Sequence, residues 1–248
     1  LMPIAEALKL NEYKGYIISH NGALCTEAES GNVLFERRID PQMVPHIEKI
    51  AQRTGLVLSY YNAGEVISTD ITNPHVQDEA AMNGMTLRQD DMISTNMDQW
   101  PCELMLVSDD EELLKGVDDY LQRHLSGVMD TIHSNPYYLE IVGYQVGKSY
   151  AMSVLVQKMG ISMSEVLAIG DGTADVGMIQ QAGVGVAMGN ATQGVKQCAD
   201  FTTLTNDQDG AAVAIERAIM EEVRKTEIPL DALHAQSQGT LMGNLGIQ

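Results

Sequence analysis

The sequence is poor in cysteine and contains no long apolar run, and each scarcity narrows the possible functions. Its 248 residues include 3 widely spaced cysteines, Cys25, Cys102 and Cys198, without a Cys-x-x-Cys pair. This odd, scattered set excludes a disulfide framework and the usual zinc-site spacings, and it makes a reducing cytoplasm the expected compartment. No apolar run reaches the roughly 18 residues that cross a bilayer, and no signal-peptide pattern is visible.

Basic residues are also scarce. The chain has 15 Lys and Arg against 34 Asp and Glu, a formal net charge of −19 and a sequence pI near 4.5. Such a surface repels nucleic acid and anionic membrane, so neither is an expected partner. A small phosphorylated substrate would also be repelled at long range, and binding one would require a local cation or a cluster of Lys and Arg.

Apolar residues make up 44% of the chain and charged residues 20%, as in a soluble globular protein of one large or two ordinary domains. Between about residues 40 and 133, helices and hairpins follow an α+β pattern with antiparallel strands. From Tyr137 onward, strands and helices alternate strictly, which predicts a parallel, doubly wound sheet. We expect the strand near Tyr16 to join that sheet, with 40–133 inserted as a separate module.

Asp171 and Asp175 occupy the most informative position in the sequence. The apolar run 166–169 ends at Gly170, which predicts a buried parallel strand with Asp171 at its carboxyl end. Asp175 follows in the turn into a helix, at the sheet edge where open α/β sheets bind ligands. Two carboxylates there suit Mg²⁺, which takes few protein oxygens and keeps positions for water and phosphate. Alternatively, either aspartate only caps the helix.

Lys148 and Asn21 are further candidates. Lys148 follows Gly147 and starts a predicted helix, where a lysine opposes the helix macrodipole unless an anion lies opposite. That conflict indicates a binding role, although a solvated surface lysine also fits. Asn21-Gly22 follows the predicted strand at 16–19, and on local evidence it is a tight-turn dipeptide.

In their order along the chain, these segments resemble the haloacid dehalogenase superfamily, and within it the Cof-type phosphatases. The segments that carry the resemblance are Asn21-Gly22-Ala23, Tyr137-Tyr-Leu-Glu-Ile141, Lys148, Gly170 to Asp175, Ala182 to Ala191 and Asn206-Asp-Gln-Asp-Gly210. The resemblance covers roughly residues 1 to 222. It implies an α/β fold with a Rossmann-like doubly wound parallel core (1–39 and 134–223), an inserted α+β cap (40–133) and a tail (224–248).

The resemblance also implies Mg²⁺-dependent phosphoryl transfer, in which one aspartate attacks phosphorus and a second acts as general acid and base. Carried over to this sequence, Lys148 neutralises the phosphoryl charge and contacts the nucleophile, Asp171 is the direct metal ligand, and Asp175 is a supporting carboxylate. Asn21 and Gly22 would lie in the loop beside the leaving group. The implied substrate is a small phosphorylated metabolite, with sugar phosphates as the usual range.

Two family segments have no counterpart in the sequence: the strand that runs into Asp-x-Asp-Gly-Thr and the later strand that ends in Thr-Gly-Arg. The first residues, Leu1-Met2-Pro3, match best just after the second of them. We therefore expect the nucleophilic aspartate and the central strand that carries it to lie upstream of the chain. Asp207 and Asp209 have the Asp-x-Asp spacing, but no buried strand precedes them. At position 174 the sequence has alanine, where the family usually has asparagine.

Two functions follow from these observations. One is a phosphatase whose nucleophile precedes the chain, and the other is a non-catalytic binding protein or inactive truncated homologue with the same fold. A dinucleotide-binding protein fits poorly, because the early strand is followed by Asn21-Gly22-Ala23 in place of Gly-x-Gly-x-x-Gly. The oligomeric state is left open. Candidates for the cap pocket, each with a surface or core role as the alternative, are His75, Asn73, Glu79, Asn96 and Trp100.

Overall fold

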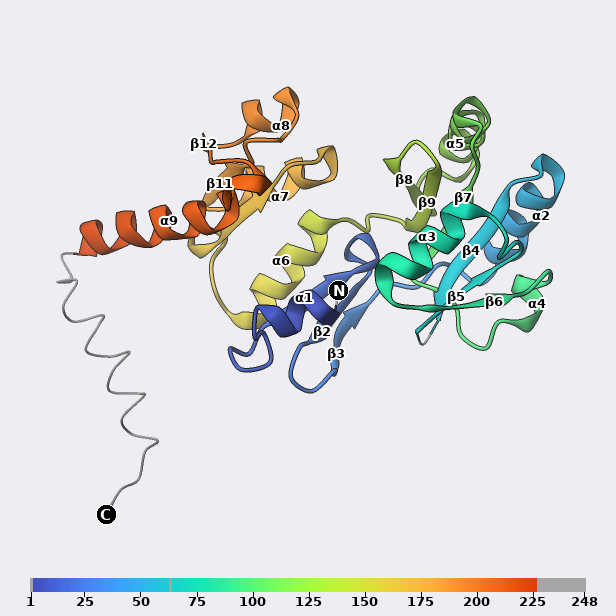
Figure 1. Ribbon diagram of the computed structural model, residues 1–248, viewed down its shortest axis with the longest axis horizontal. Coiled ribbons are helices and arrows are strands. Elements are labelled where there is room, and N and C mark those ends of the chain that lie inside the picture. The colour runs from blue at the N-terminus through green and yellow to red at the C-terminus, as the bar shows by residue number, and fades with distance from the viewer. Residues whose placement is uncertain (1, 63, 227–248) are drawn as a thin grey trace, which may run out of the picture. The chain divides into compact units, whose positions relative to one another are not determined.

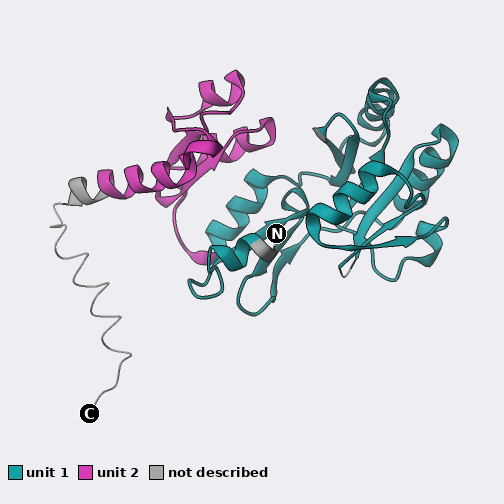
Figure 2. Ribbon diagram, viewed as in Figure 1, with its two compact units in different colours: residues 1–158 teal, residues 159–248 magenta. Residues whose placement is uncertain are grey.

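The structure is a computed structural model that describes residues 2–62 and 64–226. The chain divides into two compact units, residues 1–158 and 159–248, which Figure 2 colours teal and magenta. Each unit has its own sheets and its own buried apolar residues. The elements are labelled in Figure 1.

The first unit contains two sheets. The smaller is antiparallel, with the order β1-β2-β3, and consists of Tyr16–Ser19, Leu24–Glu27 and Val33–Glu36. The larger has the order β6-β5-β4-β7-β9-β8. Its strands, from β4 to β9, are Val57–Asn62, Glu65–Ser68, Thr86–Gln89, Glu103–Val107, Met129–Asn135 and Tyr138–Gly143. The helices α1 to α6 are Met2–Ala7, Val44–Thr54, Pro74–Asn83, Ile93–Asn96, Glu111–Leu125 and Lys148–Met159, and the 3-10 turn η1 is His20–Gly22.

Strand β7 is the centre of the larger sheet. Every residue of Glu-Leu-Met-Leu-Val is buried there, because β4 and β9 pair on either side and helices cover both faces. Side chains alternate between the faces of a strand. Leu104 and Leu106 accordingly pack in one apolar cluster with residues of α2 and α5, while Met105 and Val107 pack in another with residues of α3. The sheet is therefore the middle layer of this part of the unit.

The strand near Tyr16 and the strand at 137–142 do not join a parallel sheet, so that prediction was wrong. β1 pairs antiparallel with β2, and β9 pairs antiparallel with β7 and β8. Short hairpin connections allow only antiparallel neighbours, whereas alternation of strands and helices along a sequence does not reveal which strands pair. The larger sheet continues to Gly143, past residue 133, and the division 1–39, 40–133, 134–223 and 224–248 stays a prediction.

The second unit contains a parallel sheet with the order β10-β11-β12, which confirms the parallel pairing predicted for this part of the sequence. Its strands are Leu167–Gly170, Val184–Ala187 and Phe201–Thr202. The helices α7, α8 and α9 are Val176–Gln181, Gln193–Cys198 and Gly210–Thr226, and the 3-10 turns η2, η3 and η4 are Met163–Glu165, Thr173–Asp175 and Asn206–Gln208. Helix α9 continues past residue 223, and the remainder of the predicted tail, 227–248, lies outside the described residues.

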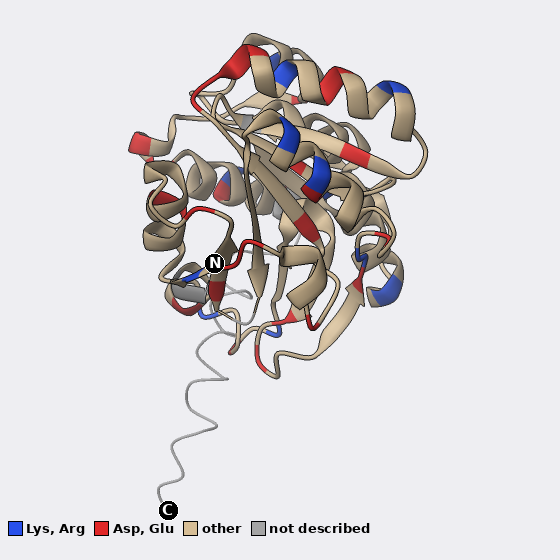
Figure 3. Cartoon of the chain, turned by 90° about the vertical axis from the view of Figure 1, so that its right-hand side faces the viewer, with Lys and Arg blue, Asp and Glu red and all other residues tan. Residues whose placement is uncertain are grey.

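Acidic residues, coloured red in Figure 3, occur in many helices and loops of the chain. Among residues 2–62 and 64–226, no helix combines the length and the apolar character that crossing a membrane requires.

Candidate functional site

The turn after β10 is shaped by Asp175. Its side chain is buried, with 4% exposed, and Oδ2 accepts hydrogen bonds from the backbone N–H groups of Asp171 and Gly172, both at 3.0 Å. Gly170 provides the necessary room, because a Cβ at that position would lie 2.4 Å from the Cβ of Asp175. The buried carboxylate therefore fixes the backbone that presents Asp171.

Asp171 itself is exposed at the carboxyl end of β10. Its Oδ2 accepts a hydrogen bond from Nδ2 of Asn190 at 3.0 Å, and Oδ1 of Asn190 accepts one from the backbone N–H of Asn206 at 3.1 Å. Asn190 thus joins the carboxylate to the loop after β12. Within the part of the chain that the structure describes, Oδ1 of Asp171 makes no hydrogen bond, so this oxygen can accept a cation.

In this turn, the carboxylate of Asp171 is the one side chain suited to bind Mg²⁺. Across the described residues, no group of three or more His, Cys, Asp or Glu side chains is arranged to hold a metal ion. Mg²⁺ in phosphate-handling sites takes only one or two protein carboxylates and completes its shell with water and phosphate, so Asp171 meets that requirement. Asp175 is buried, and its Oδ2 is already used by two N–H groups. Its predicted place as a metal ligand stays a prediction.

The structural role of Asp175 can be tested by the variant Asp175→Ala. We expect the free energy of unfolding to fall by about 2 to 4 kcal/mol, because two partly buried N–H groups lose the buried carboxylate that accepts from them. Urea unfolding followed by circular dichroism measures the change. Asp207→Ala, in the exposed turn η4, is the matched control and should stay within about 0.5 kcal/mol of the wild type. Equal midpoints for the two variants would contradict the role given to Asp175.

His20 and Asn21 form a second polar group, in the first unit. Their φ angles, +49° and +52°, lie in the left-handed region that residues with side chains rarely adopt. Nδ2 of Asn21 donates to Oε1 of Glu103 at 3.0 Å and to Oε2 of Glu140 at 2.8 Å, and Nδ1 of His20 lies 3.3 Å from Oε2 of Glu103. These contacts to β7 and β9 stabilise the unusual backbone conformation.

A cavity of about 310 Å³ opens beside Asn21. Its lining residues come from the β1–β2 hairpin and from the larger sheet with its connections: Ile17, Ser19, His20, Asn21, Thr26, Tyr61, Asn83, Met85 and Glu103. The hydroxyl of Tyr61 donates to Oε1 of Glu79 at 2.6 Å, and Nδ2 of Asn83 donates to the same oxygen at 2.7 Å. Burial and the Glu79 carboxylate raise the pKa of Tyr61. The cavity therefore combines acidic and neutral hydrogen-bonding groups, without a lysine or arginine among these lining residues.

The start of α6 lies against the Asn21 loop. Gly22 has φ +99°, and a Cβ on it would lie 2.4 Å from the carbonyl oxygen of Gly147 and 3.1 Å from the backbone nitrogen of Lys148. Only glycine allows so close an approach of two backbones. Asn21, Gly22 and Lys148 therefore meet within the first unit, although their sequence positions are far apart, and their roles in binding stay predictions.

The predicted site residues fall into two groups. Asp171 and Asp175 share a turn of the second unit, and Asn21, Gly22 and Lys148 meet in the first.

Four of the five cap candidates have a structural partner that explains them. Oδ1 of Asn73 accepts hydrogen bonds from two N–H groups at the start of α3, Nε2 of His75 lies 2.7 Å from Oδ1 of Asp109, and Nδ2 of Asn96 donates to Asp90. Glu79 holds two residues of the cavity wall, and Trp100 is partly exposed.

Sequence reasoning missed His20, Tyr61, Glu103 and Glu140 as parts of the Asn21 group. A signal was present for the two glutamates, because Glu103 begins the otherwise apolar strand Glu-Leu-Met-Leu-Val and Glu140 interrupts Tyr-Leu-Glu-Ile-Val. A carboxylate in a buried strand is rare unless it is paired.

Comparison with known proteins gives consistent matches. The model of the haloacid dehalogenase-like hydrolase family matches residues 1–215. A haloacid dehalogenase-like hydrolase structure from Bacteroides thetaiotaomicron is 38% identical, with 87% of this chain and 81% of that chain covered and a TM-score of 0.82. The structure of TM0651 from Thermotoga maritima is 28% identical, with 85% and 80% covered and a TM-score of 0.71. The 5-amino-6-(5-phospho-D-ribitylamino)uracil phosphatase YcsE of Bacillus subtilis is 39% identical over 92 residues, 37% of each chain.

Proposed function

We propose, on the premise that this chain belongs to the haloacid dehalogenase-like hydrolases, that it takes part in Mg²⁺-dependent hydrolysis of small phosphorylated metabolites. The observation that carries the proposal is the turn after β10, where buried Asp175 fixes the backbone and leaves the Asp171 carboxylate exposed. A carboxylate held in one orientation at a strand end is suited to a divalent ion shared with a phosphate.

Each residue then has a defined task. Asp171 would hold the ion, and Asn190 would orient the carboxylate through its 3.0 Å hydrogen bond. When bound, Mg²⁺ supplies positive charge to the phosphoryl oxygens. Lys148 would neutralise further charge on the phosphoryl group, which a chain of net charge −19 would otherwise repel.

The attacking carboxylate is assigned to no residue of the described chain. In the 248 residues the letters Asp-x-Asp occur only at Asp207 and Asp209. The structure has Asp207 in the exposed turn η4, and Asp209 follows it with φ +56°. This turn follows the two-residue strand β12, so these carboxylates do not resemble a nucleophile presented by a buried strand. The alternative function, a binding protein that keeps the fold without hydrolysis, is separated from the phosphatase by the turnover assay below.

The cavity beside Asn21 suggests the substrate class. The carboxylate of Glu103 accepts a hydrogen bond at its wall, and Glu79 holds the lining residues Tyr61 and Asn83 from behind. A carboxylate and neutral polar groups pair with the hydroxyls of a sugar or polyol, while the carboxylate repels another carboxylate. The name of the Bacillus subtilis relative specifies a ribityl phosphate, which is a polyol phosphate. We propose that the leaving group is a polyol or sugar and that it lies in this cavity.

Phosphate release by the intact protein tests the function. With Mg²⁺ present, we expect turnover of sugar phosphates and of 5-amino-6-(5-phospho-D-ribitylamino)uracil, at a kcat/KM at least about tenfold above that for phosphorylated carboxylic acids. Lys148→Ala should lower kcat/KM by about 10²-fold or more. Lys158→Ala, at the other end of α6, is the matched control. If the protein binds these compounds but shows no Mg²⁺-dependent turnover, the result contradicts the phosphatase and supports the binding protein.

A further inference from the structure

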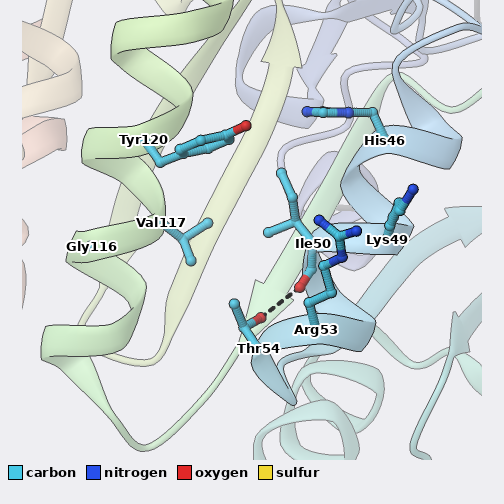
Figure 4. A pocket seen from close by; sticks show the side chains of 8 residues that line it. All are labelled: His46, Lys49, Ile50, Arg53, Thr54, Gly116, Val117 and Tyr120. Atoms are coloured by element: carbon cyan, nitrogen blue, oxygen red, sulfur yellow. Dashed lines mark hydrogen bonds between the residues drawn. The ribbon is translucent and has the colours of Figure 1, made fainter.

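A second cavity of the first unit, of about 350 Å³, lies between α2 and α5. Figure 4 shows its lining, which comes from α2 on one side and α5 on the other: His46, Lys49, Ile50, Arg53, Thr54, Gly116, Val117 and Tyr120. It shares no lining residue with the cavity beside Asn21.

Three basic residues line this cavity from one face of α2. His46, Lys49 and Arg53 are separated by three and four positions, the spacing that places side chains on the same face of a helix. Basic residues are few, 15 Lys and Arg against 34 Asp and Glu. Arg88 and Arg123 lie beside carboxylates, but in the part of the chain that the structure describes no ion pair joins the three residues of α2 to a carboxylate. The charges of Lys49 and Arg53 are therefore not taken up by an ion pair among the described residues.

Helix electrostatics do not account for all three. A basic side chain near the carboxyl end of a helix interacts favourably with the macrodipole, and Arg53 lies in the last turn of α2. His46 lies in the first turn and Lys49 near the middle, so neither is at the end of the helix where the dipole favours a basic side chain. The position of these two residues is better explained by a ligand than by stability of the helix.

The remaining wall of the cavity is apolar and aromatic. Ile50 is half-buried, Val117 is buried, and Thr54 uses its hydroxyl to donate to the carbonyl oxygen of Ile50 at 2.8 Å. Gly116 adds no side chain, and a Cβ there would meet nothing within 4 Å. In Figure 4 the ring of Tyr120 lies across the opening from His46. An aromatic ring and an apolar floor suit a planar ligand.

We propose that the cavity between α2 and α5 binds a small aryl or heteroaryl phosphate. Arg53 and Lys49 would bind the dianion, since guanidinium and ammonium groups both pair with phosphate. The ring of the ligand would lie on Ile50 and Val117, beside Tyr120. The volume is at the lower end of the roughly 300 to 1,000 Å³ common for small-molecule sites, which limits the ligand to about the size of a mononucleotide. Binding here requires no hydrolysis.

Phenylphosphonate, a non-hydrolysable aryl dianion, is the probe. We expect saturable changes in the NMR signals of the His46 and Tyr120 rings, with the signals assigned from His46→Gln and Tyr120→Phe. Methylphosphonate lacks the ring and benzyl alcohol lacks the charge, and each should bind at least about tenfold more weakly at these signals. The His46 and Tyr120 signals report on binding in this cavity, so phosphonate bound at the phosphatase site is not counted as binding here.

Charge-removing variants complete the test. Lys49→Gln and Arg53→Gln should each weaken phenylphosphonate binding by about tenfold. Arg123→Gln removes the same charge from α5 at a residue that does not line the cavity, and it should bind as the wild type does. The proposal is overturned if the ring signals do not change up to about 10 mM phenylphosphonate, a weak-binding limit, or if all three variants bind equally.

Discussion

Replacement of Asp171 by asparagine is expected to lower the Mg²⁺-dependent kcat/KM of the intact protein by at least about 10³-fold. Asparagine keeps an oxygen that can accept the hydrogen bond from Nδ2 of Asn190, so the turn after β10 should persist. What is lost is the negative charge that, in the proposed function, would hold the metal ion beside the phosphate. Phosphate release at saturating Mg²⁺ measures the effect, and removal of the metal with a chelator should abolish wild-type turnover.

Asp207→Asn is the matched control for this variant. Asp207 belongs to the same unit and is exposed in η4, and it is the first member of the Asp-x-Asp pair that does not follow a buried strand. Its loss should change kcat/KM by less than about twofold. If Asp207→Asn reduced turnover and Asp171→Asn did not, the result would contradict Asp171 as the metal ligand and favour Asp207 in η4. A loss of circular dichroism in Asp171→Asn would instead indicate that the residue supports the fold.

Gly22→Ala is expected to destabilise the protein by at least about 3 kcal/mol. Two costs add at this position. The φ of +99° lies outside the small left-handed region open to residues with a Cβ, and that Cβ would lie 2.4 Å from the carbonyl oxygen of Gly147. Because the obstacle is backbone, a rotamer change cannot relieve the clash. Urea unfolding gives the free energy directly.

Gly31→Ala separates the two costs. Gly31 lies between β2 and β3 and also has a positive φ, +71°, but a Cβ there would meet nothing within 4 Å. We expect this variant to lose only about 1 kcal/mol, the cost of the backbone conformation alone. The difference between the variants measures the contact between the Asn21 loop and the start of α6. Equal losses would show that this contact is not rigid.

Local chemistry explains which elements could be predicted from the sequence. The dipeptide Asn73-Pro74 predicts a helix start, and the structure confirms it because the Asn73 side chain caps α3. Gly55 predicts the end of the preceding helix, and α2 ends there with a φ of +76° at Gly55. The strand before Asp171 is confirmed as β10, although only Ala168 and Gly170 are fully buried in it. The dipeptide Asp40-Pro41 also predicts a helix start, but this prediction was wrong: α2 begins at Val44, because Asp40 accepts a hydrogen bond from the N–H of Gln42 in a turn.

Pairing between distant segments could not be predicted in the same way. Strands β8 and β9 were recognised, but their antiparallel place beside β7 depends on residues that are far apart in the sequence. The hydrogen bonds from Asn21 to Glu103 and Glu140 depend on the same packing. A turn dipeptide and two glutamates in apolar strands give separate signals, and nothing in their spacing indicates that they meet.

The sequence by itself determined the chemistry available to this protein: a chain with few basic residues, an acidic turn after a short strand, and a set of segments that resemble one family of hydrolases. Only the tertiary structure decided that Asp175 is buried while Asp171 is exposed, which side chains surround Asn21, and that His46, Lys49 and Arg53 line one cavity. The physical reason is the range of the interactions. Caps, turns and side-chain periodicity act within a few residues, whereas burial, sheet pairing and cavities arise when distant segments pack together.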